Sequence, residues 1–237
     1  MYGWRARIGL IVPSSNTTME SEFWKLAPPG VSIHTSRIKL VEVTAEALKE
    51  MVKEVTRAAE ELATAEVDVI VFGCTTGSLL EGIEWENRLR ESIESKVGIK
   101  TVTTAQAVVE ALRKLKAKKI VVATPYIDEL NEREKKFLEE NGFKVLKIKG
   151  LGIIKNSEIG KQEPWVAYRL AKEVFQKEAD AVFISCTNFR TIEIIEALEQ
   201  DLERPVVSSN TASFWYALRS IGITTKIEGY GKLLARH

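Results

Sequence analysis

The sequence predicts an α/β protein made of two similar lobes, each a parallel sheet covered by helices. Three observations support this fold class: short apolar strands alternate with amphipathic helices, the pattern occurs twice within 237 residues, and no Pro/Gly/Ser-rich linker separates the copies. Strands that alternate with helices connect by right-handed crossovers, which gives a mostly parallel sheet with helices on both faces. The duplication predicts pseudo-twofold symmetry, with the active site in the cleft between the lobes.

The expected strands are short runs rich in Val and Ile that are mostly apolar throughout, as strands buried on both faces should be. They are Ile8–Val12, Val31–Ile38, Val67–Phe72, Lys100–Thr103, Lys119–Ala123, Lys144–Ile148, Ala181–Ser185 and Pro205–Ser208. Helices are expected where apolar residues recur at three- and four-residue steps. They are Ala45–Ala65, Ala105–Leu115, Asp128–Asn141, Trp165–Gln176, Thr191–Asp201 and Ala212–Ser220.

The repeat is clearest around the two cysteines. Four residues of the first copy recur in the second at a constant offset: Glu66, Asp68, Cys74 and Thr75 match Glu178, Asp180, Cys186 and Thr187. The same offset carries Pro13 onto Pro125. From this repeat we expect a first lobe of residues 1–98 plus 206–237, which carries Cys74, and a second lobe of residues 99–205, which carries Cys186.

Composition excludes several function classes. The 34 basic and 33 acidic side chains leave a formal charge of +1. This balance does not indicate binding to nucleic acid or to an acidic membrane surface. The apolar run Ile8–Val12 is too short for a signal peptide, and no run approaches the ~20 residues of a membrane span. We therefore expect a cytoplasmic protein. The only histidines are His34 and His237, so zinc-ligand spacing is absent, and no phosphate-binding loop is found; neither a metal nor a cofactor is expected.

Small polar side chains follow several predicted strands, where ligands bind in parallel α/β sheets. Asn16, Thr75, Tyr126 and Thr187 come just after strands one, three, five and seven, and Thr76 follows Thr75. Hydroxyl and amide groups of this kind can hold a small anion. Purely structural roles remain open for three of these residues. Asn16 can cap the next helix, Tyr126 can be a half-buried surface residue, and Asn156, in the loop after strand six, can form a turn.

Cys74 and Cys186 are each expected at a strand end and a helix start. A helix N-terminus favours thiolate over thiol, and such a cysteine acts as a nucleophile or as an acid/base. The alternative is a pair of inert buried cysteines, since free cysteine is among the most buried residue types. The symmetric placement of the only two cysteines favours a catalytic pair.

These residues resemble the aspartate/glutamate racemase superfamily and, within it, the maleate cis-trans isomerases. The resemblance is carried by segments along nearly the whole chain: Gly3–Gly9, Pro13–Glu20, Cys74–Ser78, Cys186–Arg190 and Pro205–Asn210. The related arylmalonate decarboxylases carry glycine where this chain has Cys74, so Cys74 points away from that branch. Ser21 stands where the isomerase pattern has proline.

The resemblance implies cofactor-independent isomerisation of maleate to fumarate through a covalent cysteine adduct in a homodimer. Cys74 and Cys186 would be the catalytic residues, and the small dicarboxylate would be held by Asn16, Thr75, Thr76, Tyr126, Asn156 and Thr187. Two alternatives stay open. An amino-acid or hydantoin racemase would use the same two thiols as an acid/base pair, and a small-carboxylate binding protein would have kept the fold without catalysis.

Overall fold

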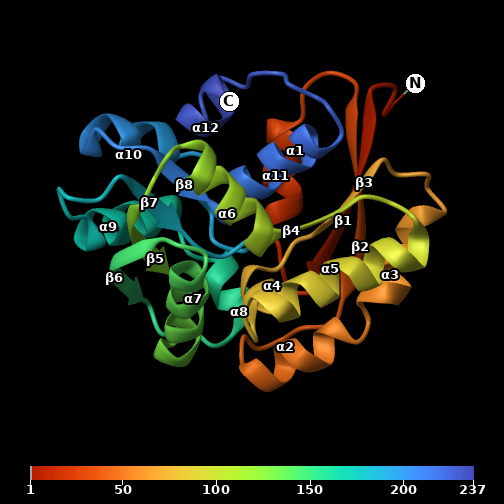
Figure 1. Cartoon of the computed structure of the whole chain (residues 1–237), viewed down its shortest axis with the longest axis horizontal. Helices are drawn as coiled ribbons and strands as arrows, with labels where there is room; N and C mark the ends of the chain where they lie inside the picture. Colours follow the sequence, from red (N-terminus) through yellow and green to blue (C-terminus); the bar gives the residue numbers. More distant parts are fainter. Residues whose placement is uncertain (1) are drawn as a thin grey trace.

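Two four-stranded parallel sheets lie beside each other in the computed structural model, which describes residues 2–237 (Figure 1). The strand order is β2-β1-β3-β4 in one sheet and β6-β5-β7-β8 in the other, so the second sheet repeats the topology of the first. The predicted fold class is therefore confirmed. The strands are β1 (Ala6–Pro13), β2 (Val31–Ile38), β3 (Val69–Phe72), β4 (Thr101–Thr103), β5 (Lys119–Thr124), β6 (Lys144–Gly150), β7 (Ala181–Ile184) and β8 (Val206–Ser208).

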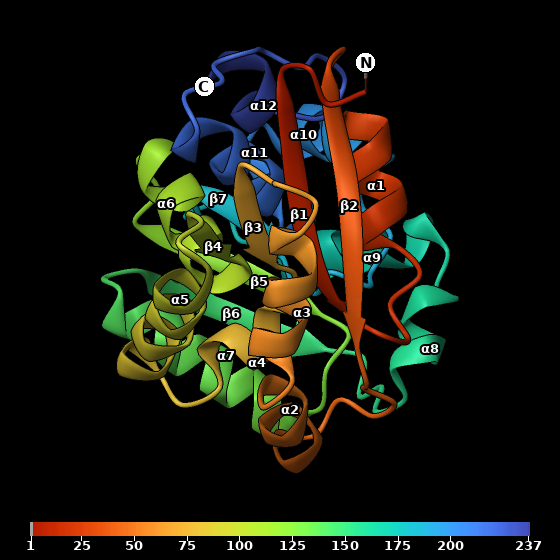
Figure 2. The same cartoon turned by 90° about the vertical axis from the view of Figure 1, so that its right-hand side faces the viewer.

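Helices connect the strands and cover both sheets; α1 and α3, for example, lie on either side of β1 and β2 (Figure 2). The helices are α1 (Met19–Leu26), α2 (Ala45–Val52), α3 (Val55–Ala63), α4 (Thr75–Leu79), α5 (Ile83–Val97), α6 (Thr104–Lys114), α7 (Asp128–Glu140), α8 (Asn156–Gly160), α9 (Pro164–Val174), α10 (Ile195–Leu202), α11 (Ser209–Ser220) and α12 (Lys232–Arg236). In the part of the chain that the structure describes, none of them has both the length and the apolar character that crossing a membrane requires.

The apolar core has two layers because successive strand residues face opposite sides of each sheet. On β1, Leu10 belongs to the layer that also contains α6 and α11, whereas Ile11 packs in the layer with α2 and α3. Phe23 and Phe214 pack edge to face in the first layer, with ring centroids 5.1 Å apart. Burial on both faces explains why the strands could be recognised as short, continuously apolar runs.

The two lobes exchange elements where they meet. Helix α11 follows β8 of the second sheet but packs against β3 and β4 of the first, and α6 follows β4 and contacts β8. The strand pairing differs from the expected lobe boundaries at two strands. β4 pairs with β3 in the first sheet, and β8 pairs with β7 in the second. As a division into folding units, 1–98 plus 206–237 and 99–205 stays a prediction.

The expected single helix Ala45–Ala65 is wrong, because the chain forms two helices there. The N–H groups of Lys53 and Glu54 bond to carbonyls three residues earlier, at 3.2 and 3.1 Å, which tightens the turn between α2 and α3. Helix α3 packs on β1 and β2, whereas α2 contacts α4. Apolar spacing is helical on both sides of the break, so the sequence pattern could not reveal it.

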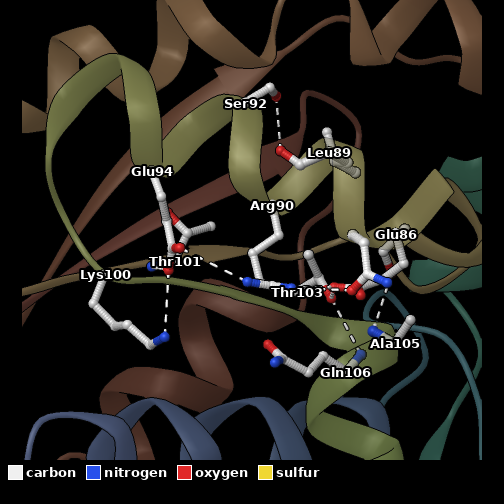
Figure 3. Close-up of polar contacts among 12 residues, drawn as sticks. Glu86, Leu89, Arg90, Ser92, Glu94, Lys100, Thr101, Thr103, Ala105 and Gln106 are labelled. Carbon is white, nitrogen blue, oxygen red and sulfur yellow. Dashed lines mark hydrogen bonds and ion pairs between the residues drawn. The ribbon is translucent and has the colours of Figure 1, made fainter. Parts of the chain in front are cut away.

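Helix α5 is not among the expected helices. Its Leu89 and Ile93 are buried in the core, and polar contacts also attach it to the neighbouring sheet (Figure 3). Its Glu86 carboxylate is buried and accepts a 2.7 Å hydrogen bond from Thr103 Oγ1 of β4. One turn further on, Arg90 lies 3.6 Å from Glu86 and 3.7 Å from Glu94. Glu94 accepts the backbone N–H of Thr101 at 2.9 Å. These side chains look like a solvated helix face in the sequence.

Candidate active site

All the residues predicted for the site line one small cavity between the two lobes. The lining consists of Pro13, Asn16, Leu40, Val43, Cys74, Thr75, Thr76, Tyr126, Asn156, Cys186 and Thr187. The free volume is about 10 Å³, which is room for about one water molecule. No lining residue carries a charged side chain, so any ligand here meets thiols, hydroxyls, amides and backbone N–H groups.

Asn16 caps a helix and also lines the cavity. Its Oδ1 accepts the N–H groups of Thr18 and Met19, each at 3.0 Å, and so caps the start of α1. Its Nδ2 donates to Thr187 Oγ1 at 3.0 Å. The amide therefore joins the loop after β1 to the loop after β7, and it borders the cavity at the same time.

Cys74 directly precedes α4, as expected. Its backbone is extended, with φ −144° and ψ 108°, and it is the N-cap residue of the helix. The thiol interacts with the backbone N–H of Gly77 and with the Thr76 hydroxyl, and both contacts favour the thiolate. Burial has the larger effect, however, and raises the pKa of Cys74 to about 11.

Cys186 lies at the end of β7 in a different local structure. Its φ is +91°, a conformation that side-chain-bearing residues rarely adopt and that costs on the order of 1–3 kcal/mol. Its backbone N–H donates to Ser209 Oγ at 3.1 Å, and its Sγ accepts the N–H of Asn188 at 3.4 Å. Burial raises the pKa of this thiol to about 12, although the Tyr126 hydroxyl opposes the shift.

Two expectations about the cysteines are therefore wrong. Cys186 does not begin a helix, because the residues after it form a loop and α10 starts only at Ile195. Neither thiol has a lowered pKa, because removing a thiolate from water outweighs the effect of its few N–H and O–H donors. The thiolate needed for chemistry is a minority species here.

The remaining predicted residues are tied into the walls of the cavity. Asn156, the first residue of α8, donates from Nδ2 to Ser15 Oγ at 2.8 Å. Thr187 donates to the carbonyl of Gly73 at 3.1 Å, across the lobe boundary. Thr75 Oγ1 lies 2.9 Å from Ser209 Oγ. Tyr126, after β5, is 2% exposed rather than a half-buried surface residue.

Two polar residues that were not predicted hold the lobes together at the site. Ser209 contacts both Thr75 and the N–H of Cys186, so one hydroxyl connects the two cysteine loops. Asn188 accepts the N–H of Thr17 at 2.9 Å and donates to the carbonyl of Asn156 at 2.8 Å. Ser209 directly follows the predicted strand Pro205–Ser208, and Asn188 directly follows Thr187, so the rule that pointed to Thr75 and Thr187 also covers them.

A short backbone pairing closes one side of the cavity. The N–H of Val43 donates to Ile154 at 2.7 Å, and the N–H of Asn156 donates to Val41 at 3.0 Å. Leu40, Val43 and Asn156 all border the free space. A four-carbon dicarboxylate is much larger than one water molecule, so the cavity must widen when such a ligand enters.

The chain is similar to known proteins over almost its whole length. The family model described as "Arylmalonate decarboxylase" matches residues 8–234. The maleate isomerase of Geobacillus stearothermophilus is 30% identical, with 97% of each chain covered. The maleate isomerase of Nocardia farcinica is 31% identical, over 96% of this chain and 95% of the relative.

A solved structure of a cysteine-to-serine mutant of the Nocardia farcinica maleate cis-trans isomerase holds a covalently bound succinylcysteine intermediate. It superposes with a TM-score of 0.95 at 28% identity, covering 98% of this chain and 99% of that one. Family model, relatives and structure thus span almost all of the chain. The chain therefore belongs to the arylmalonate decarboxylase family, in which the relatives described above are maleate isomerases.

Proposed function

We propose that this protein isomerises maleate to fumarate through a covalent adduct on Cys74, with Cys186 as the proton donor. The observation that carries the proposal is the meeting of the only two cysteines in one uncharged cavity, each at the end of an equivalent strand. The family relatives supply the reaction, since those described are maleate isomerases and one holds a succinylcysteine.

The chemistry requires a carbon–carbon double bond to become single for a short time. The Cys74 thiolate forms a bond to one alkene carbon, the π electrons move to the other carbon, and that carbon takes the proton of Cys186. The adduct then rotates about its new single bond. The Cys186 thiolate removes the proton again, the double bond re-forms, and the bond to Cys74 breaks. Both thiols end in their starting protonation states.

Negative charge moves toward a substrate carboxylate during this sequence, and fixed donors stabilise it. We propose that Asn16, Tyr126 and Asn156 supply these donors, together with the hydroxyls of Thr75, Thr76 and Thr187. All six residues line the cavity. A cavity of this size also excludes bulk water, which would otherwise weaken the interaction of these donors with the developing charge.

The finer statements of the resemblance remain predictions. We expect a homodimer in the cytoplasm that binds neither nucleic acid nor membranes and needs no metal or organic cofactor. Sedimentation velocity of the purified protein tests the dimer. Turnover after exhaustive dialysis against a chelator tests the metal, and activity restored by a divalent ion would overturn that prediction.

Proton NMR in deuterated water tests the reaction itself. Maleate should give fumarate, whereas L-aspartate, L-glutamate and a hydantoin should show no deuterium at their α-carbons. Racemisation needs an acidic proton on an sp³ carbon, so α-exchange at a rate comparable to maleate turnover would replace the isomerase with a racemase. If no substrate reacts and maleate does not protect Cys74 from iodoacetamide, a binding protein becomes the better description.

A further inference from the structure

A carboxylate without a counter-ion lies behind Cys186. Glu134 of α7 is fully buried, and its Oε1 accepts a 2.6 Å hydrogen bond from Ser185 Oγ. Its Oε2 is equally buried and has no hydrogen-bond partner among residues 2–237. Ser185 immediately precedes Cys186 in the chain. One hydrogen bond offsets only part of the free energy needed to remove a carboxylate from water. The burial of Glu134 therefore needs an explanation.

No neighbouring cation among residues 2–237 pairs with Glu134, so its negative charge acts on the Cys186 thiol. The titratable groups that act on the Cys186 thiol are Tyr126, Cys74 and Glu134, and the Tyr126 hydroxyl also interacts with Ser185. Helix α7 packs against α4, which has no charged residue, and against β6. Two of the three β6 lysines contact Glu173 instead: Lys147 donates to its carbonyl at 3.0 Å, and Lys149 pairs with its carboxylate. The third, Lys144, is exposed.

The repeat supplies an internal comparison for Glu134. Glu134 follows Glu22 by 112 residues, the same distance by which Cys186 follows Cys74. Glu22 is also buried, but its carboxylate accepts N–H groups from Thr191, Ile192 and Asn210. At the position equivalent to Ser185 the first copy has Gly73, which offers no hydroxyl. Glu22 thus contacts the loop after Cys186, at Thr191 and Ile192, whereas Glu134 contacts the residue directly before Cys186.

We infer that Glu134 is a positioning residue that, when ionised, keeps Cys186 in its thiol form and so reserves the nucleophile role for Cys74. Two effects act together. The negative charge disfavours a second negative charge on the nearby sulfur. The carboxylate also accepts the hydrogen bond of the Ser185 hydroxyl. The Ser185 oxygen can then only accept from Tyr126, and it competes with Cys186 for the Tyr126 O–H. The inference rests on the roles that the proposed function gives to the two cysteines.

The pH at which this control operates follows from the burial of Glu134, which raises its pKa to about 8. Below that pH the carboxyl is neutral and exerts no charge on Cys186. Above it the carboxylate is ionised. If Glu134 had only a structural role, replacing it would change Cys186 reactivity by the same factor below and above this pH.

The test measures alkylation of Cys186 without using maleate. In a Cys74→Ala background, Cys186 is the only thiol, and its labelling by iodoacetamide is followed by intact mass at about pH 6.5 and about pH 9.5, on either side of the Glu134 pKa. We expect Glu134→Gln to speed labelling about 3- to 10-fold at the higher pH, since one pKa unit corresponds to tenfold in thiolate. At the lower pH it should match its parent.

Glu22→Gln is the matched control. It removes the equivalent buried carboxyl, which contacts the loop after Cys186 at Thr191 and Ile192 but is not among the groups that act on the Cys186 thiol, so it should leave the ratio of the two rates unchanged. Equal acceleration at both pH values, no acceleration, or the same response from Glu22→Gln would each overturn the inference. If Glu134→Gln does not fold, Ser185→Ala serves instead: loss of its donor raises the pKa of Glu134, so labelling at the higher pH should again be faster. Failure of maleate turnover with the labelling pattern intact would refute the proposed function alone.

Discussion

Cys74 and Cys186 occupy equivalent places in two copies of one strand pattern, yet their surroundings differ. Cys74 has extended backbone, precedes a helix, and contacts an N–H and a hydroxyl. Cys186 has a positive φ, precedes a loop, and lies near Tyr126 and a buried carboxylate. The repeat therefore places two sulfurs at one cavity, and the differences between the copies give the two thiols different surroundings. The predictions below test differences between the two copies.

The largest expected effect comes from removing either sulfur. Cys74→Ala and Cys186→Ser should each lower turnover of maleate by at least ~10³-fold, about 4 kcal/mol in barrier, while the fold is retained. The variants should differ in what they trap. Intact mass after incubation with maleate should show one added maleate on Cys74 in Cys186→Ser and none in Cys74→Ala. Trapping in both variants, or activity within ~10-fold of wild type, would contradict the assigned roles.

The buried carboxyls give the next largest effect, on stability. Burial raises the pKa of Glu22 from 4.5 to about 7, so between these values the folded protein holds a proton that the unfolded chain releases. Stability is therefore lost as pH rises through this window, by on the order of 3 kcal/mol. Glu22→Gln should flatten this part of the profile. Urea unfolding of both proteins at several pH values measures the difference, and identical slopes would refute the shift.

Removing the Tyr126 hydroxyl should affect the Cys186 side alone. Tyr126→Phe should lower turnover about 10²-fold, because both the substrate donor and the hydrogen bond to Cys186 are lost. Iodoacetamide labelling of Cys74 should keep its wild-type rate, because Tyr126 is not among the groups that set its pKa. A parallel fall in Cys74 labelling would mean that the two sulfurs are not independent.

The smallest expected effect concerns the Cys74 side. A Cβ at Gly77 would lie 3.0 Å from Cys74 Sγ and 3.0 Å from Met51 Cε, so Gly77→Ala should press on the first thiol. We expect about tenfold slower labelling of Cys74, with Cys186 unchanged. Stability should change by less than about 1 kcal/mol, because alanine favours the helix and offsets part of the crowding. Labelling and thermal melting of the same sample check both statements.

Most of the fold followed from the sequence because buried parallel strands are written as continuous apolar runs. All eight predicted strands are present, and the Val31–Ile38 bounds are unchanged. The elements that escaped depend on contacts distant in sequence. The break between α2 and α3 serves packing on two different partners. Helix α5 buries Glu86 beside Leu89 and Ile93, so a charged residue interrupts its apolar face.

The candidate site was predictable for a different reason. Residues such as Asn16 and Thr187 follow strand ends, and parallel topology brings strand ends together without further information. The protonation of the thiols was not predictable, since it depends on the depth of burial around Cys74 and Cys186. The hydrogen bond between Ser185 and Glu134 joins residues 51 positions apart, so no local sequence pattern predicts it.

The pseudo-twofold repeat has a consequence for how such a site can change over generations. In a dimer of two identical half-length chains, one mutation alters both copies, so a serine beside one cysteine would appear beside the other. When both copies lie in one gene, each mutation reaches a single copy. Gly73 and Ser185 differ here at equivalent positions. Joining the halves in one chain thus allows the two cysteines to acquire different neighbours.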